Sequence, residues 1–224
     1  MKEPKNSAKS VSGKELDKLI ASTPKYFTQD EIQAILSVLH DGENRLLFQL
    51  GLELGARVSE IESLKWSNIN FKDKYIVIWD EKKDCFRTCT VPEYIWGLLK
   101  EFKTGIDTRK EIRVFPYSYK TLNRRIKEWT IQASIERLFY SRANAPDKKE
   151  SKARWHFLRH TYVVQSRRAG RDWDIISLQT GDRVATLIQE YSKLSLEDRI
   201  RISTEKPIVP RAEDIEIKNG KVKQ

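Results

Sequence analysis

The chain has 224 residues, enough for one large domain or two small ones, and carries a formal net charge of +10 at pH 7. This surplus of lysine and arginine favours polyanionic partners such as nucleic acids. No apolar N-terminal run and no apolar stretch of about 20 residues is present, which argues against a secreted or membrane-spanning protein.

The first helices are predicted from capping residues and apolar spacing. Residues 1–23 are rich in lysine and serine without a sustained period, so we expect a flexible basic arm or linker there. Thr28 and Glu31 have the spacing of a capping box, and apolar residues at helical spacing follow them. A mostly apolar helix over 44–54 then ends at Gly55, and a short amphipathic helix follows it.

The hydrophobic period next changes from that of a helix to that of a strand. YIVIW (75–79) and CFRTCTV (85–91) flank the charged segment DEKKD, which predicts a β-hairpin with a basic tip. A short strand near 69–71 is expected to precede it. Cys85 and Cys89 would lie on one side of the second strand, too far apart for an easy disulfide, which fits a reducing compartment.

The rest of the chain is predicted to be mostly helical. Apolar periodicity predicts helices over 93–102, 119–134, 156–169, 172–179 and 184–195. The polar segment RANAPDKKESK (142–152) is expected to be a loop, and the mixed-charge tail over 201–224 is expected to be an arm. The predicted fold class is therefore mainly α with a small antiparallel β-sheet (α+β), in one domain over 24–200.

Residues far apart in the sequence together suit the chemistry of a phosphodiester. Arg57 and Arg159 each offer a planar donor fork that fits phosphate oxygens and stabilises the charge that grows there. His156 lies on the same helix face as Arg159 and exchanges a proton near neutral pH. Tyr191 becomes a nucleophile if nearby arginines lower its pKa below the ordinary value of about 10.

The proton for a leaving oxygen is expected to come from the hairpin tip. Lys82 or Lys83 can donate it, although lysines at such a tip are also a common solubility device. The sequence has no dense carboxylate cluster suited to Mg²⁺, so we expect a metal-free mechanism. A zinc site made by His156, His160 and the two cysteines is the weaker alternative, because HFLRH lacks the glutamate of the HExxH pattern.

Three segments resemble the motifs of a known family. They are GLELGARVSEIESLKWSNI around Arg57, HFLRHTY from His156, and the stretch from Gly181 to Tyr191. In this order they resemble the catalytic domain of the tyrosine recombinases, which include phage and plasmid integrases and Xer-type resolvases. The resemblance implies that Tyr191 attacks the scissile phosphate and forms a 3′-phosphotyrosyl bond, while Arg57 and Arg159 clamp that phosphate.

The resemblance also implies the remaining roles and the partners. His156 takes part in proton transfer, Lys82 or Lys83 protonates the leaving 5′-oxygen, and no metal, ATP or other cofactor is needed. A homotetramer, assembled from monomers in solution, is expected to act on double-stranded DNA at a specific recombination site of a mobile or replicating element. The tail over 201–224 is expected to be exchanged between subunits. We expect a cytoplasmic, nucleoid-associated protein encoded by a prokaryote, virus or plasmid.

The chain departs from the family pattern at three places. Asp182 stands where the family has His or Trp: it orients an arginine while Arg183 supplies the positive charge, or the position is tolerant, or the register is shifted by one. The hairpin lacks the usual Gly-Lys-Gly tip, so Lys82 and Lys83 remain equal candidates. Residues 1–23 cannot form the DNA-clamping domain that precedes family catalytic domains, so the chain is expected to be an isolated catalytic domain or a minimal enzyme.

Other readings of the same residues stay open. A basic helix is expected to contact the DNA backbone or major groove, unless it is only a solvated face, through Lys120, Arg124, Arg125 and Lys127. His160 is expected to be structural. The alternative functions are a type IB topoisomerase-like nicking-closing enzyme and a non-catalytic DNA-binding protein on a recombinase scaffold. Asp182 favours the second of these.

Overall fold

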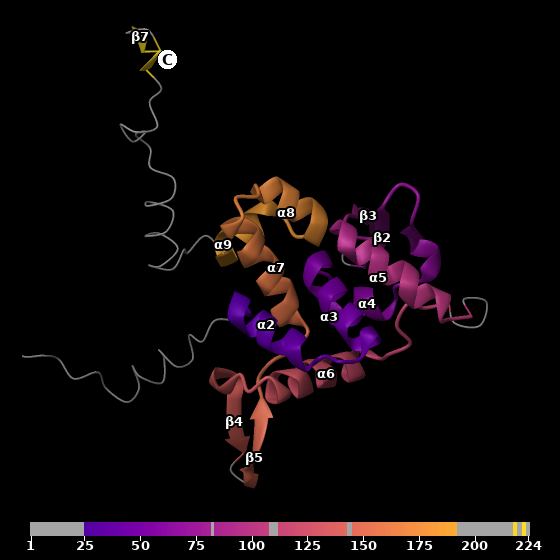
Figure 1. The fold of residues 1–224 in the computed structure, drawn as a ribbon, viewed down its shortest axis with the longest axis vertical. Coiled ribbons are helices and arrows are strands. Elements are labelled where there is room, and N and C mark those ends of the chain that lie inside the picture. The colour runs from indigo at the N-terminus through magenta and orange to yellow at the C-terminus, as the bar shows by residue number, and fades with distance from the viewer. Residues whose placement is uncertain are drawn as a thin grey trace, which may run out of the picture.

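The computed structural model describes residues 25–191, except 82, 108–111 and 143–144, together with 217–218 and 221–222. Its helices are α2 (Gln29–Val38), α3 (Gly42–Leu54), α4 (Val58–Glu62), α5 (Glu93–Thr104), α6 (Tyr119–Gln132), α7 (His156–Arg168), α8 (Trp173–Thr180) and α9 (Val184–Tyr191), with 3-10 turns η1 (Trp66–Asn68) and η2 (Glu136–Leu138). Its strands are β1 (Ile69–Asn70), β2 (Tyr75–Asp80), β3 (Cys85–Cys89), β4 (Phe139–Arg142), β5 (Ala145–Ser151), β6 (Ile217–Lys218) and β7 (Lys221–Val222). Figure 1 shows a helical body with β2 and β3 at one edge, so the expected α+β class is confirmed.

The first two helices begin and end where the sequence predicts. At the start of α2 the Thr28 hydroxyl accepts a hydrogen bond from the Glu31 amide at 3.2 Å, and the Thr28 amide donates to the Glu31 carboxylate at 2.8 Å. The end of α3 is Gly55, whose φ of +56° is the left-handed conformation that favours glycine. A Cβ atom at Gly55 would lie 2.7 Å from the Tyr162 ring, so this glycine also lets α3 approach α7 closely.

The hydrophobic core ties α3 and α7 to the segment before α2. Phe27 is fully buried and packs on the rings of Phe48 and Phe157, with ring centroids 6.5 Å and 5.6 Å away. Its backbone amide donates to the Thr161 hydroxyl of α7 at 2.8 Å. Because α7 carries the HFLRH segment, this packing fixes the histidines and Arg159 relative to the body of the protein.

The predicted hairpin is confirmed as β2 and β3, with β1 as the short strand beside β2. Ile76, Ile78 and Asp80 lie on one face of β2 and are buried, and Arg87 of β3 pairs with Ile78 on that face. Cys85 and Cys89 are free thiols, as expected. The strands therefore bring a buried carboxylate and a guanidinium to the side of the sheet that faces the helices.

The loop expected over 142–152 is wrong, because most of this segment forms an antiparallel hairpin of β4 and β5. Its sequence is polar and lacks an alternating apolar pattern, so nothing in its periodicity indicates a strand. The pairing is made by backbone hydrogen bonds, and its base is anchored where the Thr130 hydroxyl of α6 donates to buried Ser151 at 2.7 Å. The single small sheet expected from the sequence is thus accompanied by further strand pairs.

The arms expected over 1–23 and 201–224 lie outside the described residues, except that β6 and β7 pair with each other near the C-terminus. The boundaries of the expected catalytic domain, 24–200, stay a prediction. Across the described part of the chain, no helix is long and apolar enough to cross a membrane.

Candidate active site

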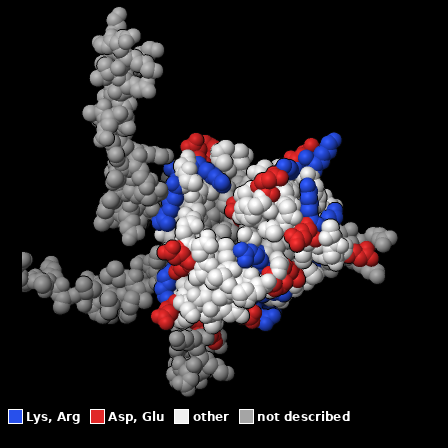
Figure 2. All heavy atoms as spheres, viewed as in Figure 1, with Lys and Arg blue, Asp and Glu red and all other residues white. Residues whose placement is uncertain are grey.

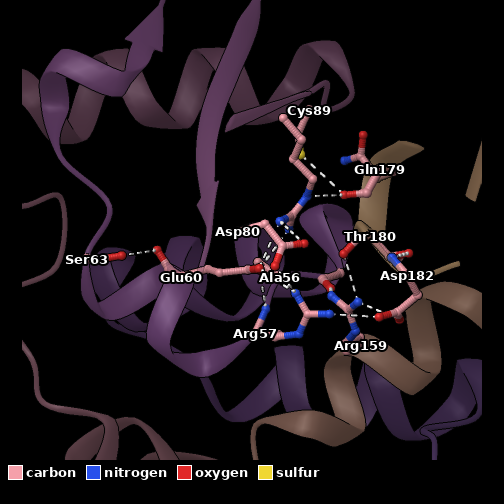
Figure 3. A network of polar contacts seen from close by, with 12 residues as sticks. Ala56, Arg57, Glu60, Ser63, Asp80, Cys89, Arg159, Gln179, Thr180 and Asp182 are labelled. Atoms are coloured by element: carbon pink, nitrogen blue, oxygen red, sulfur yellow. Dashed lines mark hydrogen bonds and ion pairs between the residues drawn. The ribbon is translucent and has the colours of Figure 1, made fainter. Parts of the chain in front are cut away.

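Arg57 is positioned by the first turn of α4, which it precedes as the N-cap residue. The Glu60 side chain reaches back across this turn and accepts hydrogen bonds from the Arg57 backbone amide at 2.7 Å and from its Nη1 at 3.0 Å. A carboxylate that holds both the backbone and the guanidinium of one residue fixes the direction of that side chain. Arg57 therefore points from the start of α4 towards α7 and α8 (Figure 3).

Arg159 lies in the first turns of α7 and is almost completely buried. Its Nη1 donates to the Gly55 carbonyl at 2.7 Å, and its Nη2 donates to the Thr180 carbonyl at 2.8 Å. These carbonyls belong to the ends of α3 and α8, where helix carbonyls lack intrahelical partners and the helix dipole is negative. The guanidinium thus joins two helix ends, which explains how a buried arginine is tolerated.

Asp182 lies between these two arginines. Its Oδ1 is 2.8 Å from Nη2 of Arg57, and its Oδ2 is 2.5 Å from Nη2 of Arg159 (Figure 3). Asp182 therefore contacts both arginines, and its expected role in orienting an arginine stays a prediction. The neighbouring Arg183, which was expected to supply positive charge, is exposed at the surface.

Three charged residues that the sequence did not single out complete the network. Arg87 donates to both carboxylate oxygens of Glu60 at 2.8 Å, and its Nε donates to the Gln179 carbonyl at 3.1 Å. Asp80 Oδ1 is 3.4 Å from Nη1 of Arg57. Burial lowers the pKa of Arg87, but its hydrogen bonds to Glu60 and the charge of that carboxylate outweigh this effect and hold the pKa above its ordinary value.

We call this network the guanidinium cluster; it comprises Arg57, Arg87 and Arg159 with Glu60, Asp80 and Asp182. Equal numbers of guanidinium groups and carboxylates make its formal charge zero. Two sequence signals pointed to the missed members. Glu60 stands at the capping-box position after Arg57, and Asp80 continues the otherwise apolar face of its strand, where a carboxylate requires a partner.

The structure also brings Tyr191, the last residue of α9, to the histidines of α7. The Tyr191 hydroxyl is hydrogen bonded to Nδ1 of His160, and the His160 ring packs edge to face with His156 at a centroid distance of 4.3 Å. His160, which was expected to be only structural, is therefore the histidine in direct contact with the candidate nucleophile. His156 lies one ring further away and remains open to solvent.

The surroundings of both histidines favour their neutral forms, because they lower both pKa values. Burial, together with the neighbouring His156, lowers the pKa of His160 from 6.5 to about 4. The atoms packed around His156, and then the charge of Arg159, lower the pKa of His156 as well. A neutral imidazole has one nitrogen with a lone pair, so His160 can accept the hydrogen bond of the Tyr191 hydroxyl.

The expectation that neighbouring arginines bring the pKa of Tyr191 below its ordinary value is wrong. Burial raises that pKa above its ordinary value, and the charge of Glu190 raises it further. Arg159 acts in the opposite direction, but its effect is smaller. The raised pKa favours the protonated phenol. Its proton must therefore pass to an acceptor during the reaction.

Lys83, the candidate proton donor that the structure describes, is not a member of the guanidinium cluster. Lys83 is exposed at the tip of the β2–β3 hairpin, and its backbone amide donates to the Asp80 carbonyl at 3.1 Å. Lys82 lies outside the described residues. Strand β2 ends at Asp80, which is a member of the guanidinium cluster, and the hairpin tip follows directly after it.

The basic helix α6 contacts the chain next to His156, at the start of α7. The Asn123 side chain accepts a hydrogen bond from the Trp155 amide at 2.9 Å, directly before His156.

The candidate DNA-contact residues on α6 differ in their exposure and in their partners. Lys120 is exposed, Lys127 is partly buried, Arg124 pairs with Glu128 at 3.0 Å, and Arg125 stacks on the Tyr117 ring at 3.8 Å. Figure 2 shows basic and acidic side chains interspersed on the face that it presents.

Comparison with known proteins places this geometry in context. The model of the phage integrase family matches residues 25–197. Tyrosine recombinase XerA of Thermococcus onnurineus (strain NA1) is 28% identical over 182 residues, which cover 80% of this chain and 62% of that protein. The chain therefore spans less than two thirds of the length of this relative.

Solved structures share the fold. The crystal structure of XerA recombinase superposes with a TM-score of 0.67 at 24% identity, covering 84% of this chain and 66% of the other. The XerH site-specific recombinase bound to its difH substrate, in a pre-cleavage complex, gives a TM-score of 0.59 at 17% identity, covering 83% and 54%. The chain has the fold of these recombinases.

Proposed function

This chain belongs to the phage integrase family, and on that premise we propose that it is a site-specific DNA recombinase that cleaves and rejoins strands through a 3′-phosphotyrosyl intermediate. One observation carries the proposal. Arg57 and Arg159, which are 102 positions apart, meet with their Nη2 groups on the two oxygens of one carboxylate, and Tyr191 contacts His160, the residue after Arg159. Two guanidinium groups that share one oxyanion are suited to a phosphodiester.

In the proposed reaction the Tyr191 oxygen forms a bond to the scissile phosphorus and the bond from phosphorus to the 5′-oxygen breaks. Arg57 and Arg159 stabilise the charge on the non-bridging oxygens. Lys82 or Lys83 gives a proton to the leaving 5′-oxygen. Rejoining reverses these steps when the 5′-hydroxyl of another strand attacks the phosphotyrosine, so the bond energy is conserved without ATP, and no metal takes part.

As the bond to phosphorus forms, the phenolic proton of Tyr191 leaves through the neutral histidines, His160 and then His156, to solvent. We assign His160 the role of a positioning residue, because its ring is hydrogen bonded to the Tyr191 hydroxyl, can accept that bond when neutral, and so fixes the direction of the nucleophile. The solvent-open ring of His156 packs on it and is placed to pass a proton to or from the site during strand exchange. Asp182 and Glu60 orient the two arginines.

The proposed partner is double-stranded DNA at a specific recombination site, bound by a homotetramer. The net charge of +10 supports a polyanionic partner. We propose backbone contacts for the basic residues of α6 and for Arg183, and an exchange of residues 201–224 between subunits. Binding should weaken steeply as salt rises if phosphates dominate the contacts.

The covalent intermediate tests the function. A duplex that carries the DNA flanking the gene, nicked just beyond the cleavage point, releases a short 5′-hydroxyl fragment, so any protein–DNA adduct is trapped. We expect the wild-type chain to form an adduct that survives denaturing electrophoresis. Tyr191→Phe, which loses only the hydroxyl, should form none, while the control Tyr94→Phe should behave as wild type. Failure of the wild type to trap an adduct on its cognate site would contradict the proposal.

A specific observation favours one other candidate, a non-catalytic DNA-binding protein on a recombinase scaffold. A guanidinium cluster without net charge attracts a phosphate weakly, and the raised pKa of Tyr191 disfavours the phenolate that would attack phosphorus. Both features fit a protein that binds DNA without cleaving it. The same trapping experiment separates the two functions, because a binding protein retards the duplex in a native gel but leaves no adduct after denaturation.

A further inference from the structure

Asp182 covers the arginine that the reaction needs. The Arg159 side chain is 2% exposed, whereas the Asp182 side chain that contacts it is 23% exposed. A guanidinium that is this deeply buried cannot touch a phosphate arriving from solvent unless something above it moves. Asp182 is the more exposed of the two groups, so it is the residue that must move.

The Nη2 groups of the two arginines already have acceptors. Nη2 of Arg159 carries two protons, and the Thr180 carbonyl and Asp182 are its two acceptors. Nη1 of Arg159 donates to the Gly55 carbonyl, and Nη2 of Arg57 donates to Asp182. We define the phosphate seat as the Nη2 groups of Arg57 and Arg159. Both of these groups are bound to Asp182.

The carboxylate of Asp182 has the form of the ligand that the seat is proposed to take. One oxygen contacts each arginine, at 2.8 Å and 2.5 Å, as the two non-bridging oxygens of a phosphodiester would. We propose that Asp182 is a built-in substitute for the scissile phosphate, which fills the phosphate seat until DNA displaces it. This inference rests on the proposed function of Arg57 and Arg159 as phosphate ligands.

The backbone around Asp182 lets its side chain leave without a change of fold. The Asp182 carbonyl accepts a hydrogen bond from the Ser177 hydroxyl at 2.6 Å, and its amide donates to the Thr180 hydroxyl at 3.3 Å. Both bonds hold the main chain and neither involves the carboxylate. A rotation about the side-chain bonds of Asp182 is therefore enough to open the seat.

Displacement gives the enzyme a threshold for binding. With Asp182 in the seat the guanidinium cluster is neutral, so a phosphate must replace an existing charge pair. A phosphate of loosely bound DNA competes poorly, whereas one held in place by many contacts to a cognate site has a high effective concentration at the seat. Asp182 thus weakens binding to any single phosphate and favours phosphates that are presented in register.

Inorganic phosphate is the probe that tests this. Its affinity is measured by isothermal titration calorimetry at constant ionic strength for the full chain and two variants. Asp182→Asn should bind phosphate about tenfold or more tightly than wild type, because the neutral amide removes the negative charge that competes with phosphate at both Nη2 groups. Asp174→Asn removes an equal charge from an exposed site on α8 and should change the affinity less than about twofold.

The melting temperature is a second readout, and it shows whether each variant is folded. Asp182→Asn should have a lower melting temperature than wild type without phosphate, and saturating phosphate should raise it by more than it raises that of the wild type. Asp182→Ser should show the same two changes. Equal phosphate affinity of wild type and Asp182→Asn, or an equal gain in Asp174→Asn, would overturn the inference.

The inference and the proposed function fail separately. If the wild type traps a covalent adduct but Asp182→Asn binds phosphate no better, the enzyme stands and the substitute role of Asp182 does not. If Asp182→Asn gains phosphate affinity but no adduct forms, the chain has the phosphate seat without the proposed reaction.

Discussion

The two halves of the candidate active site differ in how firmly they are held. On one side each guanidinium of the cluster contacts carbonyl or carboxylate groups from other elements, as Arg159 does at 2.7 Å and 2.8 Å. On the other side Lys83 is exposed on a hairpin tip, and Tyr191 is held through its hydrogen bond to His160. The arginines that are proposed to bind phosphate are thus part of the folded core. Lys83 and Tyr191, which are proposed to donate a proton and to attack phosphorus, are separate from it.

This contrast predicts that arginine substitutions affect folding and activity together. Arg159→Ala should lower the free energy of unfolding by about 3–5 kcal/mol, because it leaves the Gly55 and Thr180 carbonyls and one carboxylate oxygen of Asp182 without their donor. Adduct formation should fall by about 10³-fold or more, since an essential charge at the phosphate is lost. Urea denaturation and suicide-substrate trapping measure the two effects.

The controls for Arg159 separate charge from geometry. Arg159→Lys keeps the charge but loses the planar fork, so both losses should remain although each should be smaller. Arg124→Ala on α6 removes an exposed arginine that pairs with Glu128, and it should change stability by less than about 1 kcal/mol. An Arg159→Ala protein as stable as the wild type would break the proposed link between the cluster and the core.

The lysines should show the opposite behaviour. Lys82→Ala and Lys83→Ala should each leave the unfolding free energy within about 0.5 kcal/mol of wild type, and one of them should slow cleavage by about 10²-fold. A substrate with sulfur in place of the leaving 5′-oxygen needs no proton and should restore the rate of that variant. Wild-type cleavage by both variants would remove the lysines from the mechanism.

The smallest predicted effect concerns His160. Its pKa is about 4 in the folded chain and near 6.5 when unfolded, so the unfolded chain binds more protons between these values. Stability contributed by neutral His160 is complete above pH 6.5 and is lost as the pH falls towards 4, by no more than about 2 kcal/mol because the ring is partly solvated.

Denaturation at several pH values between 7 and 4 checks this dependence. His160→Asn places an uncharged polar group near the position of Nδ1 and should flatten the curve. The exposed His40→Asn should leave it unchanged. Identical pH curves for wild type and His160→Asn would show that His160 titrates as it does in the unfolded chain.

Local patterns account for what the sequence predicted well. The capping box at Thr28, the left-handed Gly55 and the hairpin each depend on residues close together in the chain, and all three are present. The meeting of Arg57 and Arg159 followed from the order of family motifs. No periodicity would have predicted it, because it depends on how α4 and α7 pack.

The features that the sequence did not predict depend on contacts between distant elements. The partners of the hairpin residues lie on other elements: Arg87 contacts Glu60 and Gln179, and Asp80 contacts Arg57. The protonated state of Tyr191 follows from burial, which a charge argument alone overlooks. The β4–β5 hairpin is held by backbone pairing, which leaves no mark in the side-chain pattern.

His160 illustrates the same limit within one helix. His156 and His160 are four residues apart on α7, so they share a face, and the sequence cannot say which of them α9 approaches. Packing decides that Tyr191 meets His160. The division between a catalytic and a structural histidine therefore needed the structure.

The central claim is that Tyr191 becomes joined to DNA, and locating the bond tests it most directly. Trypsin cuts after Arg183 and Lys193, so Tyr191 is the one tyrosine of the peptide over 184–193. After trapping on a suicide substrate and nuclease digestion, mass spectrometry should find this peptide carrying a nucleotide through a 3′-phosphate on Tyr191. A nucleotide attached to any other residue, or an unmodified peptide in a sample that contains the adduct, would contradict the account.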